Sequence, residues 1–436
     1  MTATRPFLGI DFGTSKSTTA WFNPRAGQAE VIKNAEGEDK TPSVAYFGHD
    51  SVLVGTPAEN MLEDEEERAR VFVGIKRNLA KRMRLALPDL RTVTPLEVVS
   101  EVLKKLKQDA EAGHFKEPVE RAVLTCPAAF TEAERKTLAE AAARAGFHTV
   151  VLLEEPVAAA LAYTRAGLKV EGHVLIYDLG GGTFDLAVLA REDDGFRLAF
   201  PPKGLRNCGG DDFDRAIYDH CDELARSTLN RTISGDEQTD LQFLRLCRQR
   251  KESLTSRERS EFSSFLPGGV RFKYTLDRAT FEGLIARHVQ ETVRLTRAAV
   301  EEARDQGYPV GTVVLIGGAS RVPLVRQLLA KDASLPAEPD RWQQQDVAVA
   351  LGAAYHGQAL WGVRDESQPQ TPLVPGLRGV PHTCPECASE VSAKAIRCSG
   401  CGYPMRGAHK KVCPECNIGV SPGVATCPEC GYPLNH

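Results

Sequence analysis

The chain has 436 residues, of which 42% are hydrophobic, and a formal net charge of −4. This length and apolar content allow two or more buried cores, and the slightly negative charge argues against a protein that binds nucleic acid through its overall charge. No apolar stretch has the length of a signal peptide or a membrane span, so we expect a cytoplasmic protein whose cysteines are thiols or metal ligands.

The first informative segment is a strand, a turn and a second strand near the N-terminus. An apolar run from Phe7 to Ile10 ends on Asp11, and the return strand covers residues 17–21. Glycine in the turn lets backbone amides approach a phosphate closely, hydroxyls add donors, and the aspartate is placed to hold hydrated Mg²⁺. The predicted ligand contacts of this turn are Asp11, Gly13, Thr14 and Ser15.

A second unit of the same design runs from Val174 to Leu189. Two such hairpins facing each other would cradle a triphosphate from both sides. Neither turn is a Walker A loop and neither opens a helix, so a P-loop or Rossmann site is not expected. The predicted contacts of this hairpin are Asp178, Gly180, Gly181, Gly182, Thr183 and Asp185.

A third glycine turn follows the apolar strand at residues 313–316. Gly317 and Gly318 lead to Arg321, and Pro323 then begins a helix. A helix start with two glycines suits a nucleotide, and the Arg321 guanidinium could lie against the base. The alternative is a plain connection between a strand and a helix.

Eight of the twelve cysteines lie in the last fifty-odd residues, as two copies of one spacing. Each copy has two Cys-x2-Cys pairs about ten residues apart, the arrangement of a closed four-cysteine Zn²⁺ site, and it resembles a double zinc ribbon. We predict two Zn²⁺ per chain, which would supply most of the folding free energy of the tail; the alternative is unpaired or disulfide-bonded cysteines. The predicted ligands are Cys384, Cys387, Cys398, Cys401, Cys413, Cys416, Cys427 and Cys430.

The predicted ribbons cover residues 383–406 and 412–436, after a proline-containing linker at 366–382. Their basic and acidic residues nearly balance, and their only aromatic residues are Tyr403 and Tyr432. A ribbon that binds nucleic acid would usually have a basic face with stacking aromatics. This composition favours a protein-docking or self-packing module and leaves nucleic-acid binding as the open alternative.

The chain from about Phe7 to Ala354, within a predicted ATPase domain of residues 1–365, resembles the nucleotide-binding domain of the DnaK-type, seventy-kilodalton heat-shock chaperones, in the actin-like ATPase superfamily. The resemblance implies an α/β fold of two lobes with ribonuclease-H-like duplicated subdomains. It rests on separate motifs: Gly9-Ile10-Asp11-Phe12-Gly13-Thr14-Ser15, Ile75-Lys76-Arg77, Pro127 with Arg135, Glu155-Pro156, the run from Leu179 to Asp185, the run from Cys208 to Asp214, Gly317-Gly318 with Arg321, and Asp346 with Gly352-Ala353-Ala354.

The resemblance implies binding of ATP or ADP with Mg²⁺ and slow ATP hydrolysis. Lys76 would supply positive charge and hold the attacking water, which Glu155, Asp178 and Asp185 would orient, while Thr183 contacts the γ-phosphate. The nucleotide contacts carried over, beyond those of the hairpins, are Gly209, Gly210, Asp211, Lys251, Thr255, Gly317, Gly318, Arg321 and Asp346.

The sequence also departs from the family pattern. Arg248 stands where the family has a glutamate and Glu252 where it has an arginine, which puts base specificity in question. No hydrophobic linker, β-sandwich peptide-binding domain or helical lid is expected after Ala354. We therefore expect a chaperone-like ATPase switch with the ribbons as partner-docking output and no membrane association. A binding-only scaffold and a nucleic-acid-associated factor remain the alternatives.

Overall fold

The computed structural model describes residues 5–362 except 65, 80, 82, 193–194, 235–236, 267, 333 and 336–343, together with 382–383, 390–391, 411–412 and 419–420. The chain divides into two compact units, Met1–Val374 and Pro375–His436. All predicted nucleotide contacts belong to the first unit. The eight predicted zinc ligands in the second unit lie outside the described residues.

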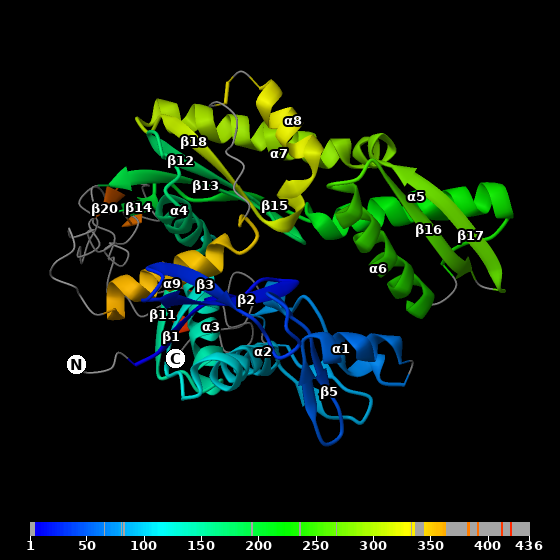
Figure 1. Ribbon diagram of the computed structural model, residues 1–436, viewed down its shortest axis with the longest axis horizontal. Helices are drawn as coiled ribbons and strands as arrows, with labels where there is room; N and C mark the ends of the chain where they lie inside the picture. The colour runs from blue at the N-terminus through cyan, green and yellow to red at the C-terminus, as the bar shows by residue number, and fades with distance from the viewer. Residues whose placement is uncertain are drawn as a thin grey trace. The chain divides into compact units, whose positions relative to one another are not determined.

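The first part of unit one, which we call lobe I, is built on a six-stranded mixed sheet (Figure 1). Its main path is β11–β10–β1–β2–β3, with β4 paired to β2. β1 is parallel to β10 and antiparallel to β2, where Asp11 pairs with Thr18. The strands are β1 (Phe7–Asp11), β2 (Lys16–Asn23), β3 (Gln28–Ile32), β4 (Thr41–Pro42), β10 (Arg121–Cys126) and β11 (Thr149–Glu154).

Two helices cover one face of this sheet, α2 (Pro95–Asp109) and α3 (Glu132–Arg144). Each begins with a capping box, formed by Thr94 with Glu97 and by Thr131 with Glu134, which satisfies backbone donors of the first turn. A smaller outer part of lobe I contains α1 (Thr56–Asn60), β5 (Ala45–Phe47), β6 (Val52–Val54), β7 (Val71–Phe72), β8 (Leu85–Ala86) and β9 (Thr92–Val93). Short helical turns at Met61–Glu63, Arg68–Arg70 and Ile75–Asn78 and a π-helix at Ala110–Phe115 complete the lobe.

The second part, lobe II, repeats the local design of the first sheet. Its path is β14–β13–β12–β18, with β15 paired to β13. β12 is antiparallel to β13 and parallel to β18, so Asp178 pairs with Asp185 on one side and Ile316 on the other. The strands are β12 (His173–Leu179), β13 (Thr183–Glu192), β14 (Gly195–Leu198), β15 (Lys203–Arg206) and β18 (Val310–Ile316).

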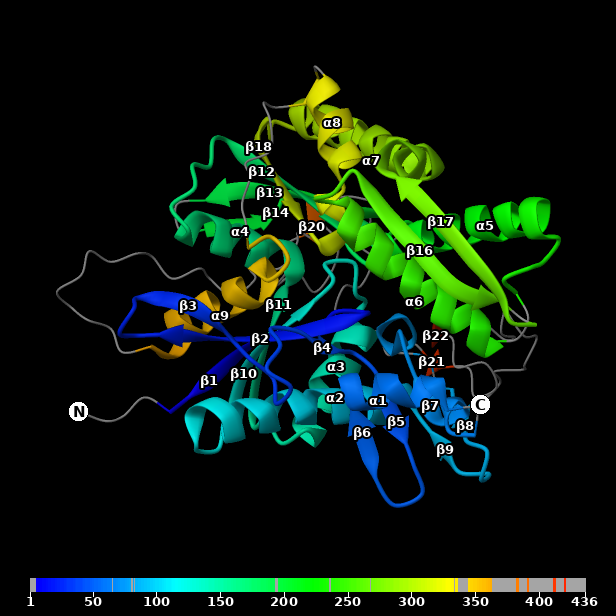
Figure 2. The same ribbon diagram turned by 45° about the vertical axis from the view of Figure 1, so that its right-hand side comes forward.

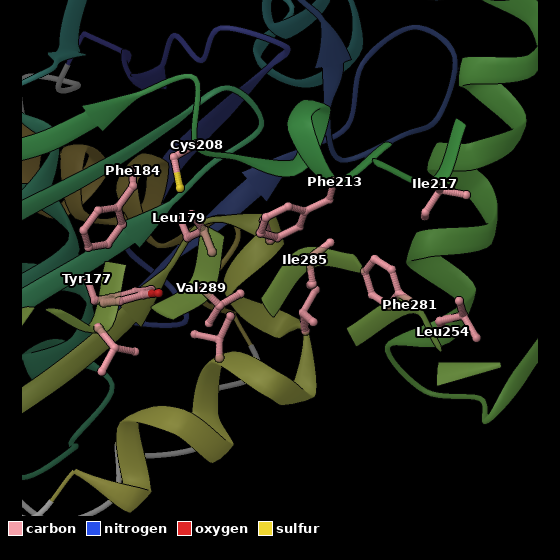
Figure 3. Packing of buried hydrophobic residues seen from close by; sticks show 14 of the residues in the cluster. Tyr177, Leu179, Phe184, Cys208, Phe213, Ile217, Leu254, Phe281, Ile285 and Val289 are labelled. Carbon is pink, nitrogen blue, oxygen red and sulfur yellow. The ribbon is translucent and has the colours of Figure 1, made fainter. Parts of the chain in front are cut away.

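The core of lobe II joins this sheet to the helices outside it (Figure 3). Tyr177, Phe184 and Phe213 are fully or almost fully buried there, and the Tyr177 hydroxyl lies 2.6 Å from the Thr292 hydroxyl. The hydrogen bond lets a large polar ring occupy the core without an unsatisfied group. The remaining elements are α5 (Gly210–Leu229), α6 (Glu237–Leu254), β16 (Arg259–Leu266), β17 (Val270–Asp277), α7 (Arg278–Asp305), a 3₁₀ turn (Gly318–Arg321) and α8 (Pro323–Lys331).

Helices α4 (Glu155–Arg165) and α9 (Ala348–Trp361) lie between the two sheets (Figure 1). They cross very closely, because a Cβ added to Gly352 would lie 1.8 Å from the Ala158 carbonyl oxygen. Only glycine permits this approach. Val157 and Ala353 then share one buried cluster with Ile176 of the second sheet. The tight crossing fixes α4, and therefore Glu155, at the junction of the lobes.

The mixed α/β prediction is confirmed, with two sheets that each carry a hairpin at the predicted place. In unit two, β19 (His382–Thr383) pairs antiparallel with β20 (Glu390–Val391), and β21 (Lys411–Val412) with β22 (Gly419–Val420). In the part of the chain that the structure describes, none of the helices has both the length and the apolar composition needed to span a membrane.

Candidate functional site

The turns of the two hairpins lie against each other. A Cβ added to Gly181 would be 2.7 Å from the Ser15 hydroxyl oxygen and 3.7 Å from an Asp211 carboxylate oxygen. The amides of Gly210 and Asp211 donate to the carbonyl oxygens of Gly180 and Gly181, at 3.0 and 2.6 Å. Three segments far apart in the sequence therefore meet: the first turn, the second turn and the start of α5.

Lys76 lies in the short helical turn Ile75–Asn78 and is almost completely buried. Its ammonium group donates to Glu155 Oε1 at 2.6 Å and lies 5.7 Å from the centre of the Phe12 ring. Burial alone would lower the pKa of Lys76, but the charges of Glu155 and Asp11 raise it above the ordinary value. The structure thus holds a lysine cation beside both hairpins.

Four carboxylates, those of Asp11, Glu155, Asp178 and Asp185, interact with the charge of Lys76. Burial and the charge of Glu155 raise the pKa of Asp11 to about 6. Burial and the charges of Glu155, Asp185 and Asp11 raise the pKa of Asp178 well above its ordinary value. Burial also raises the pKa of Asp185, although a hydrogen bond from the Thr183 hydroxyl, at 2.8 Å, opposes this. The site has an excess of negative charge that additional positive charge would relieve.

This donor set fits hydrated Mg²⁺. Magnesium prefers carboxylate oxygens and keeps several of its waters, so it is often held through them. Among the described residues, no group of three or more His, Cys, Asp or Glu side chains is close enough to ligate an ion directly. Asp11, Asp178, Asp185 and Glu155 are the carboxylates that would hold hydrated magnesium.

A cavity of about 20 Å³ lies against Glu155, Asp178 and Asp185. This volume is enough for one water molecule. The rest of its lining is apolar: Pro127, Ala128, Ala129, Pro156, Ile176, Leu186, Ala187 and Pro202. A water there would find its polar partners among the carboxylates that the sequence analysis assigned to water orientation.

The predicted nucleoside contacts on α5 and α6 form an ion cluster. Lys251 donates to the Gly210 carbonyl oxygen at 2.6 Å and pairs with buried Asp214 at 2.8 Å. Arg248 pairs with Asp211 at 3.0 Å and with Asp214 at 3.4 Å. Arg248 therefore connects α6 to the helix whose first residues contact the second turn. The Thr255 hydroxyl donates to the Glu252 carbonyl oxygen within the last turn of this segment.

The third glycine turn contacts the second hairpin. Gly317 has a φ of +81°, and a Cβ there would lie 2.4 Å from the Leu179 carbonyl oxygen and 2.6 Å from Asp178 Oδ1. The space beside Gly318 is open, with no atom within 4 Å of an added Cβ. Arg321, at the end of the turn, donates to Asp346 at 2.7 Å. The predicted residues Gly317, Arg321 and Asp346 thus form one connected group next to Asp178.

Two further predicted contacts lie in the glycine turns. Thr14 is in the first turn, next to Ser15, and Gly182 is in the second turn, next to Gly181.

Two predicted glycines are required by close backbone packing. A Cβ at Gly13 would lie 2.1 Å from the Lys16 carbonyl oxygen, and a Cβ at Gly209 would lie 2.6 Å from the Gly181 carbonyl oxygen. Glycine is required at both positions because backbone occupies the space of a side chain.

Three residues of this region were not among the predicted ligand contacts. Lys40 pairs with Asp346 at 2.8 Å, Asp214 anchors Lys251, and Arg245 of α6 pairs with Glu63 at 2.8 Å. The last contact connects the outer parts of the two lobes, which project on the same side of the molecule (Figure 2). The sequence offered one signal, for the contact of Asp214. Asp211 and Asp214 are three residues apart on α5, and Arg248 and Lys251 are three apart on α6, so each pair lies on one face of its helix.

Comparisons with known proteins agree with this geometry. The family profile described as Hsp70 protein matches residues 7–88 and 86–369. The chaperone protein DnaK of Thermosipho africanus is 36% identical over 362 residues, which is 81% of this chain and 59% of that protein. The DnaK proteins of Thermosipho melanesiensis and Thermotoga neapolitana are each 35% identical, over 362 and 367 residues, with the same shares covered. The chain thus spans 59% of the length of these curated relatives, and it belongs to the Hsp70 family.

Proposed function

We propose that the chain is a chaperone-type, cytoplasmic conformational switch that binds ATP between its lobes and hydrolyses it slowly. The main support for this proposal is that the two glycine turns lie together beside the Lys76–Glu155 ion pair and three further carboxylates. The Lys76 nitrogen is 2.6 Å from the Glu155 carboxylate oxygen. Backbone amides and hydroxyls of the turns can hold phosphates from two sides. The relatives named as chaperones support the chaperone type.

Each side chain of the site has a proposed role in ATP hydrolysis. Phosphoryl transfer to water needs the water aligned with the phosphorus and the negative charge of the phosphate balanced. Glu155, Asp178 and Asp185 border the cavity that can hold a water, and Lys76 supplies a fixed positive charge beside them. Bound Mg²⁺ would neutralise further charge on the phosphates. Thr183 and Thr14 offer hydroxyl groups toward the terminal phosphate.

Binding and release would couple to movement of the lobes. The first turn belongs to lobe I, whereas the second turn and the Gly317 turn belong to lobe II. A ligand that contacts all three favours the closed arrangement, and its loss favours opening, as in other hinge-closing enzymes. We propose the two predicted zinc ribbons as the output that engages a partner protein. Steady-state release of phosphate from ATP tests the enzymatic part of this proposal.

Gly317→Ala is expected to weaken ATP binding by tenfold or more. The new methyl group would collide with the Leu179 carbonyl and displace the Asp178 carboxylate, and the positive φ adds strain of roughly 1–3 kcal/mol. Gly307→Ala is the matched control, because Gly307 has a φ of +82° with no atom within 4 Å of an added Cβ. Equilibrium ATP binding and thermal unfolding of both variants separate strain from displacement. Equal losses of ATP affinity in the two variants would contradict this assignment.

A further inference from the structure

One carboxylate connects two cations that come from different lobes. Asp346 lies just before α9, and its two oxygens accept from Lys40 at 2.8 Å and from Arg321 at 2.7 Å. Lys40 is in the loop between β3 and β4 of lobe I, while Arg321 ends the glycine turn after β18 of lobe II. The Lys40–Asp346 contact spans 306 residues of sequence.

The Lys40–Asp346 pair of this group is less exposed than a neighbouring surface ion pair, and Arg321 is 43% exposed. The side chains of Lys40 and Asp346 are 28% and 27% exposed, whereas those of Lys33 and Asp39, a pair in the same loop, are 64% and 57% exposed. Burial alone would raise the pKa of Asp346, but the hydrogen bond and charge of Lys40 and the charge of Arg321 lower it. Partly buried charges interact more strongly than exposed ones because water screens them less.

A second contact supports the same connection. The Gln345 side-chain amide lies 3.4 Å from the Ser320 hydroxyl, which itself donates to the Gly317 carbonyl oxygen at 2.6 Å. The loop before α9 therefore contacts two adjacent residues of the turn, Ser320 and Arg321. Since Gly317 lies against Asp178, the turn also borders the phosphate side of the site. Any shift of Asp346 would be transmitted to this turn.

We propose that Lys40 is a positioning residue for the nucleoside end of the ligand: through Asp346 it fixes the orientation of Arg321 and connects the Arg321 turn to lobe I. This inference rests on the proposed binding of ATP, and it adds a lobe I residue to a contact otherwise made by lobe II. Without Lys40, Asp346 has one fewer anchor and Arg321 loses its fixed geometry. Within the described residues, none of the Lys40 hydrogen bonds reaches the two glycine turns. Its charge also favours the ionised form of Asp11, so we expect only a small effect of Lys40 on phosphate binding.

Lys40→Met tests this with two probes, ATP and inorganic tripolyphosphate, each with magnesium. Methionine keeps the unbranched side chain and removes the charge. We expect ATP affinity to fall roughly tenfold, within the usual range for coupling between sites, while tripolyphosphate affinity stays within about twofold, a change too small to indicate coupling. Lys33→Met is the matched control, since it removes a lysine from the same loop without touching Asp346. Lys40→Arg should restore most of the ATP affinity.

A double-mutant cycle with Arg321→Ala makes the test specific. In the Arg321→Ala background, Lys40→Met should have no further effect on ATP affinity. The inference is overturned if Lys40→Met weakens both probes equally, weakens neither, or still weakens ATP binding without Arg321. Thermal unfolding of each variant shows whether folding is intact. If the wild-type chain binds neither probe, the proposed function fails; if it binds both but Lys40→Met changes nothing, only this inference fails.

Discussion

Lys76→Ala is expected to bind ATP while hydrolysing it at least about a hundredfold more slowly than the wild-type chain. Lys76 is a buried cation with a 2.6 Å contact to Glu155, and Glu155 lines a cavity large enough for one water molecule. A charge in this place acts mainly on the transition state, where negative charge on the phosphate must be balanced. A hundredfold loss corresponds to about 2.7 kcal/mol of activation free energy.

The measurement is single-turnover hydrolysis with ATP bound in advance, accompanied by equilibrium ATP binding. Lys33→Ala is a suitable control because it also removes a lysine of lobe I, but one whose side chain is 64% exposed. Lys76→Ala also leaves the largely buried Glu155 carboxylate without its cation, so a loss of stability of up to about 3–5 kcal/mol is expected and thermal unfolding should be recorded. Hydrolysis at the wild-type rate by a folded Lys76→Ala chain would show that the assignment of Lys76 is wrong.

The purified chain is expected to contain two zinc ions, and Cys398→Ser is expected to reduce this to about one. Two four-cysteine sets with one repeated spacing predict two closed tetrahedral sites, and a serine hydroxyl does not replace a thiolate ligand. Loss of zinc should unfold the first ribbon, because we expect metal binding to supply most of its folding free energy. ATP binding by the body should be largely retained.

Metal analysis by mass spectrometry, combined with limited proteolysis of the tail, measures both effects. Cys221→Ala provides the control, because Cys221 is a buried free cysteine of lobe II and its removal should leave two zinc ions. A zinc content near zero in a chain whose tail resists proteolysis would refute the ribbon assignment.

The two hairpins could be predicted from the sequence because their signals are local. An apolar strand that ends in aspartate, a glycine turn and a return strand occupy about fifteen consecutive residues in each case, and the register places Asp178 opposite Asp185. The closing of the two turns on each other could not be read from spacing. It depends on the approach of Gly181 to Ser15 and on the crossing of α4 and α9 at Gly352.

Lys76 was assigned only through the family resemblance. It lies in a four-residue helical turn with no periodic pattern, and its partner Glu155 is 79 residues away. Lys40 had no signal in the sequence, since its partner Asp346 is 306 residues away. Long-range ion pairs of this kind depend on the tertiary fold and have no counterpart in local spacing.

Arg248, which departs from the family pattern, shows that the effect of a substitution depends on contacts that the sequence does not give. The sequence suggested a changed base site, because an arginine stands where the family has a glutamate. The structure places that arginine against Asp211 and Asp214, and Lys251 against Asp214 and the Gly210 carbonyl. The charge change is thus accommodated within the α5–α6 cluster that supports the second turn. The effect of such a substitution on the site can be inferred only when the residues that the new side chain contacts are known.

Multiple-turnover release of phosphate from ATP by the wild-type chain tests the central claim most directly. We expect magnesium-dependent, saturable release of several phosphates per chain, at a rate well below the roughly 10 s⁻¹ of a typical enzyme. The same preparation should show ATP binding at equilibrium. A folded chain that binds ATP with magnesium but releases no phosphate over many hours would contradict the switch and leave a scaffold in which the nucleotide is only structural.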